Sequence, residues 1–159
     1  MSIKDRVEEA ELLWSQGRKE GAWVPALVAT AATARKRYPR PMNDREAFTS
    51  FIADITFTIM TGKAGGARPL HFEFYENTWG DGLTLGDVLY KKVRCSLIHE
   101  GELTEAGFSK STEKDGRYTA QLSVPSHGNA QIPDFWALHL LVAVKNAPEN
   151  SGLFHPHTP

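Results

Sequence analysis

Arg94 and His99 are the residues of this sequence whose types and spacing are best suited to chemistry on a phosphate. Four residues separate them within the segment LYKKVRCSLIHEG, residues 89–101. An imidazole has an ordinary pKa of about 6.5, so it can accept or donate a proton near neutral pH. A guanidinium is a planar cation that stabilises negative charge on phosphoryl oxygens through paired hydrogen bonds. The pair therefore indicates a candidate site for proton transfer and charge stabilisation at a phosphate.

The helix expected around this segment limits how the two side chains can act together. Five positions along an α-helix turn the chain by about 140°, so the two side chains leave a straight helix in different directions. They converge if the last turn loosens, or if two copies of the helix face each other. Structural roles are also open: an ion pair of Arg94 with Asp87 or Glu100, and capping of the last helical carbonyls by His99.

The segment LYKKVRCSLIHEGEL, placed in a late helix of a mainly helical chain, resembles the HEPN superfamily. The signature of that family is an arginine, about four to six further residues and a histidine at the end of one helix. Arg94 and His99 match these two positions, and Glu100-Gly101 matches the usual continuation. The layout is similar as well, because helices precede the motif and an apolar helix follows it.

The resemblance implies a mainly α fold, a HEPN-like antiparallel bundle of about five helices. It also implies a metal-independent endoribonuclease acting as a homodimer, with Arg94 and His99 of both copies in one cleft. His99 would take the proton of an RNA 2′-hydroxyl and Arg94 would stabilise the phosphoryl charge, giving a 2′,3′-cyclic phosphate. Lys91 and Lys92 would bind flanking RNA phosphates, and no metal or cofactor is expected. The expected setting is a toxin–antitoxin or anti-phage defence system, with a cognate antitoxin as a further partner.

Cys95 departs from the pattern of active family members, which often carry Asn, Asp or His directly after the arginine. A thiol is only a weak hydrogen-bond donor, and cysteine is commonly a small buried apolar residue. This favours an alternative function, a non-catalytic HEPN-like module that dimerises and binds a partner. In a third interpretation the chain is an unrelated helical protein in which the Arg–His pair arises by chance.

Apolar spacing predicts the elements that must position these residues. Pro25 is expected in the first turn of its helix, and Pro133 at the first position of the last helix, where a missing N–H costs little. A small β-hairpin is expected before the last helix, turning at Lys114-Asp115-Gly116. Residues 62–69 are expected to form a flexible connection, and residues 71–82 a short extended stretch and a Gly-rich loop. The predicted helices cover residues 2–16, 23–38, 43–61, 84–101 and 133–147.

Composition places the chain among ordinary globular proteins. It has 159 residues, with 18 basic and 19 acidic side chains and a formal net charge of −1. This balance excludes a surface that holds nucleic acid by its overall field, so any such binding must be local. The sequence predicts a cytoplasmic protein. It contains a single cysteine, it has no signal-peptide pattern, and its apolar runs are too short for a membrane span. We expect one domain over residues 1–147 and a flexible tail over residues 148–159.

Three further groups of side chains are weaker candidates. His155 and His157, near the C-terminus, could coordinate a metal ion. Structural zinc takes four ligands, so these two histidines are not expected to form such a site. His139 stands in the most apolar helix and is expected to be a hydrogen-bonded core or interface residue. A basic cluster suits either an RNA-contacting patch or the C-terminal end of a helix; its members are Arg35, Lys36, Arg37, Arg40 and Arg45.

Overall fold

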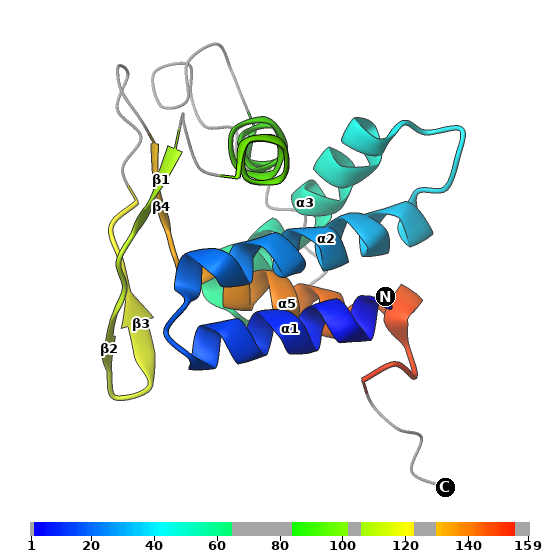
Figure 1. Cartoon of the computed structure of the whole chain (residues 1–159). Coiled ribbons are helices and arrows are strands. Elements are labelled where there is room, and N and C mark those ends of the chain that lie inside the picture. The colour runs from blue at the N-terminus through cyan, green and yellow to red at the C-terminus, as the bar shows by residue number, and fades with distance from the viewer. Residues whose placement is uncertain (1, 65–83, 102–105, 123–129, 155–159) are drawn as a thin grey trace, which may run out of the picture.

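The chain folds into a mainly α structure with two small pairs of strands at one side (Figure 1). The computed structural model describes residues 2–64, 84–101, 106–122 and 130–154. This confirms the predicted fold class, a helical bundle with a small hairpin. The predictions for residues 65–69 and 71–82 concern residues outside those that the structure describes.

The first two helices, α1 (Ile3–Ser15) and α2 (Lys19–Arg37), lie side by side and run in opposite directions (Figure 1). Ser2 caps α1, since its hydroxyl accepts from the Asp5 N–H at 3.1 Å while the Asp5 carboxylate accepts from the Ser2 N–H at 2.8 Å. This capping box confirms the predicted start of the first helix.

Helix α2 begins earlier than predicted, at Lys19, so Pro25 lies inside the helix and not in its first turn. A proline inside a helix removes one hydrogen bond and crowds the carbonyl four residues back, which here belongs to Gly21. The prediction failed because tertiary burial outweighs this local preference. Trp23 and Leu27, on either side of Pro25, are completely buried in the core.

Helices α3 (Asp44–Thr61) and α5 (Trp136–Asn146) complete the centre of the bundle. Asn43 caps α3 through its side-chain oxygen, which accepts from the Glu46 N–H at 2.8 Å. Gly62 ends α3 in the left-handed conformation at φ 70°. The two helices contact each other and α2, and their apolar faces fill the core with buried Phe48, Phe51, Ile52, Ile59, Leu140 and Val144.

Residues 85–100 form one continuous helix, which we call the 85–100 helix. It consists of α4 (Leu85–Asp87), η1 (Val88–Arg94) and η2 (Ser96–Glu100), and it crosses the other helices steeply, so that Figure 1 shows it end-on in green. Thr84 and Asp87 form a capping box at its start, and Gly101 ends it at φ 75°. The predicted bounds of this helix are therefore confirmed.

The strands confirm one prediction and correct another. β2 (Thr112–Lys114) and β3 (Arg117–Thr119) form the predicted hairpin, with Asp115 and Gly116 at φ 54° and 73° in its turn. β1 (Ala106–Ser109) and β4 (Ala130–Pro133) form a parallel pair that the sequence did not indicate. Pro133 therefore ends a strand opposite Ser109, and α5 starts three residues later than predicted.

The first part of the expected tail packs against the bundle. η3 (Pro148–Asn150) follows α5, and the buried Asn150 amide donates to Thr33 Oγ1 and to the Val144 carbonyl, both at 2.9 Å. These bonds join the ends of α2 and α5. Within the described residues, no helix combines the length and the apolar character needed to cross a bilayer.

Candidate functional site

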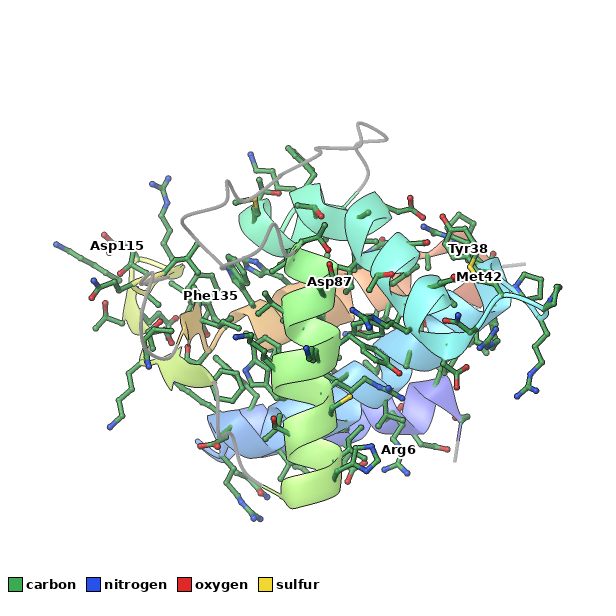
Figure 2. All side chains as sticks on the ribbon, turned by 90° about the horizontal axis from the view of Figure 1, so that it is seen from above. Arg6, Tyr38, Met42, Asp87, Asp115 and Phe135 are labelled. Atoms are coloured by element: carbon green, nitrogen blue, oxygen red, sulfur yellow. The ribbon has the colours of Figure 1, made fainter. Side chains whose placement is uncertain are left out.

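The 85–100 helix carries the candidate site on an outer face of the molecule. Figure 2 shows this helix lying across the others, with Asp87 toward one of its ends. Leu85, Leu89 and Val93 are buried against the bundle, while Lys91, Ile98 and His99 are exposed on the opposite side. Apolar residues at helical spacing thus fix one side of the helix to the core and leave the motif side open to solvent.

Arg94 lies at the edge of this helix that faces α3. Its Cζ atom is 5.2 Å from the ring centroid of Tyr90, one turn earlier, and 5.9 Å from that of Phe48 on α3. The two rings are themselves 5.7 Å apart, so they hold the guanidinium between helices. Its Nε atom is buried without a hydrogen-bond partner in the described part of the chain.

Asp87, the expected acidic partner of Arg94, is engaged elsewhere. Its carboxylate accepts from the Thr84 cap and from Arg45 on α3, the latter at 3.3 Å. Burial is the largest single influence on the pKa of Asp87 and raises it. The hydrogen bonds from Thr84 and Arg45 together outweigh burial, so the pKa lies below its ordinary value. The structure therefore does not contain the Arg94–Asp87 pair, and the Glu100 side chain lies outside what is described. Two aromatic rings therefore contact Arg94 in place of the expected Asp87 carboxylate.

His99 is exposed in the last turn, two residues before the helix ends at Gly101. Lys91 is exposed on the same helix, and Lys92 is half-buried. Cys95, between Arg94 and His99, is a half-buried free thiol. The sequence-predicted residues thus share one helix, and the RNA-binding role of the two lysines stays a prediction.

The helix between Arg94 and His99 combines an unusual hydrogen-bond pattern with ordinary backbone angles. The N–H of Cys95 bonds to the carbonyl of Tyr90, five residues back, and bonds of this type run through η1 and η2. Cys95 nevertheless has φ −63° and ψ −42°, the values of an α-helix. Among the described residues, no hydrogen bond joins the Arg94 and His99 side chains.

Three arginines of the basic cluster, Arg35, Arg37 and Arg45, have acidic partners. The Arg37 guanidinium binds both Glu149 oxygens, at 2.7 and 3.1 Å, and Asp54 at 3.1 Å. Arg35 binds Asp44 and the Met42 carbonyl. Hydrogen bonds from Arg35 are the main cause that lowers the pKa of Asp44, and the charge of Arg94 contributes least. These pairs support the structural interpretation of this cluster.

His139 is a hydrogen-bonded, half-buried residue, which confirms the hydrogen bond that was predicted for it. Its Nδ1 atom lies 2.5 Å from the Ile59 carbonyl, and burial lowers the pKa of the ring below its ordinary value. A Cβ atom on Gly62 would lie 2.7 Å from His139 Nε2, so the ring also fills the space beside the end of α3. His155 and His157 lie outside the described residues. Within those residues, no three His, Cys, Asp or Glu side chains gather as metal ligands would.

Sequence reasoning missed the two rings that hold Arg94. Tyr90 stands four residues before Arg94 on the predicted helix, where helical neighbours meet, so this spacing could have identified it. Phe48 comes from another helix, and nothing in the sequence pairs it with Arg94.

Comparison with known proteins gives one match. The family model described as Rv1289 matches residues 2–157 of the chain. Neither the curated proteins nor the solved structures yield a match.

Proposed function

The chain belongs to the Rv1289 family, and from the site just described we propose that it is a HEPN-like, metal-independent endoribonuclease acting as a cytoplasmic homodimer. The observation that carries the proposal is the setting of Arg94. Its guanidinium is held by Tyr90 and Phe48, with no ion pair to an acidic side chain among the described residues. On the same helix, His99 is exposed to solvent. An arginine with no carboxylate partner in the described part of the chain and an exposed imidazole suit a phosphodiester substrate.

Each residue has a defined role in the proposed reaction. His99 takes the proton of the 2′-hydroxyl as O2′ forms a bond to the neighbouring phosphorus. Arg94 stabilises the charge that develops on the non-bridging oxygens. The bond from phosphorus to O5′ breaks, and the proton returns through solvent to O5′. The products are a 2′,3′-cyclic phosphate and a 5′-hydroxyl, with no change in the number of protons.

The proposed homodimer would bring the two residues together from different copies. Arg94 lies at the α3 edge of the helix, and no hydrogen bond joins it to His99 among the described residues. A second copy of the 85–100 helix facing the first would bring the arginine of one copy toward the histidine of the other. Ile98 is 42 % exposed on this face and supplies an apolar contact for such a pairing. Lys91 and Lys92 of both copies would then flank the RNA.

The test is cleavage of single-stranded RNA by the full chain in the presence of a metal chelator. We expect wild-type protein to give 2′,3′-cyclic phosphate ends, and His99→Ala to lower the rate on the order of 10²–10⁴-fold. Lys63→Ala, an exposed residue after α3, is the control and should cleave as wild type does. Equal cleavage by wild type and by a His99→Ala/Arg94→Ala double variant would contradict the mechanism.

A non-catalytic HEPN-like module is the second candidate, and Cys95 together with Ile98 favours it. A half-buried thiol follows the arginine, and the exposed isoleucine suits a protein partner such as an antitoxin. In that case the wild-type chain cleaves no RNA, while Ile98→Asp still prevents dimerisation or partner binding. Growth arrest on overexpression, relieved by His99→Ala, would exclude this second candidate.

A further inference from the structure

We draw no further inference here: the strongest candidate, the cavity of about 570 Å³ between the start of α2 and the strand region, carries nothing because a helix start with exposed cations does not identify a ligand and because Asp134 Oδ1, a buried oxygen without a hydrogen-bond partner among the described residues, is shielded from the cavity.

Discussion

The arginines at the end of α2 and Arg94 on the 85–100 helix are the same residue type in opposite electrostatic settings. Arg37 forms hydrogen bonds to two carboxylates and packs 4.7 Å from the Phe51 ring. Arg94 packs against two rings and forms no ion pair with a described residue. Both guanidiniums contact aromatic rings, so what separates them is the acidic partner.

This difference separates the two arginines by what a negatively charged ligand would have to displace. A guanidinium already bound by carboxylates must exchange those bonds for phosphate, whereas one held by rings keeps its charge unneutralised. Arg37 therefore serves the joint between α2, α3 and η3. Arg94 is positioned by two aromatic rings and has no ion pair with a described residue.

Arg94→Ala should lower the RNA cleavage rate on the order of 10²–10³-fold, the usual result of removing one donor to a transition-state oxyanion. Its stability should fall less than that of Arg37→Ala, because contacts with two rings are lost but no ion pair to a described residue. Single-turnover cleavage and thermal unfolding measure the two effects. A fully active Arg94→Ala protein would contradict the proposed role of Arg94 in cleavage.

Arg37→Ala should give the reverse result. It removes a half-buried ion-pair network with Glu149 and Asp54, and we expect a loss of about 1–3 kcal/mol in unfolding free energy. Cleavage by the folded protein should remain unchanged. Urea unfolding provides the measurement, and Arg40→Ala serves as an exposed control. An unchanged urea midpoint for Arg37→Ala would contradict a structural role.

Tyr90→Leu tests whether the Tyr90 ring positions Arg94. Leucine keeps an apolar side chain but removes the ring face that attracts the guanidinium, so cleavage should fall on the order of tenfold. Tyr90→Phe keeps the ring and should retain wild-type cleavage. If both variants lose activity equally, the hydroxyl or the packing matters and not the ring.

The smallest expected effect is a pH dependence of the unfolding free energy, which arises from the Glu149–Arg37 pair at the end of α2. Hydrogen bonds from Arg37 lower the pKa of Glu149, although burial opposes them. The stability from this carboxylate is therefore present above its unfolded pKa of about 4.3 and is lost as pH falls through the lower folded value. We expect at most about 1 kcal/mol, absent in Arg37→Ala, when urea midpoints are compared between neutral and acid pH.

At alkaline pH the same region behaves in the opposite sense. The Asp54 carboxylate accepts from the Tyr38 hydroxyl at 2.6 Å and raises the pKa of Tyr38 to about 12. That stability is complete below the unfolded tyrosine pKa of about 10 and is lost as pH rises toward 12. Tyr38→Phe should remove this alkaline loss, as measured by urea unfolding.

Most of the fold could be predicted because its helices carry local start and stop signals. Ser2, Asn43 and Thr84 cap their helices as the sequence indicates, and Gly62 and Gly101 end theirs. The early start of α2 could not be predicted, because it depends on the burial of the residues around Pro25. The parallel β1–β4 pair joins residues far apart in the chain, and neither short strand alternates strongly enough to show it.

The shared helix of Arg94 and His99 was predictable from the sequence, while the roles of the two side chains stay predictions. The rings that hold Arg94 were predictable only in part. Tyr90 stands one helical turn away, but Phe48 comes from another helix and only the fold brings it to Arg94.

The position of α5 has a consequence for how the protein is made. This helix contacts both α2 and α3, although it stands far from them along the chain. Until residues 136–146 have left the ribosome, α2 and α3 have no partner for the faces they bury against α5. Those apolar faces therefore wait for a distant segment, and the bundle closes only after that segment has emerged.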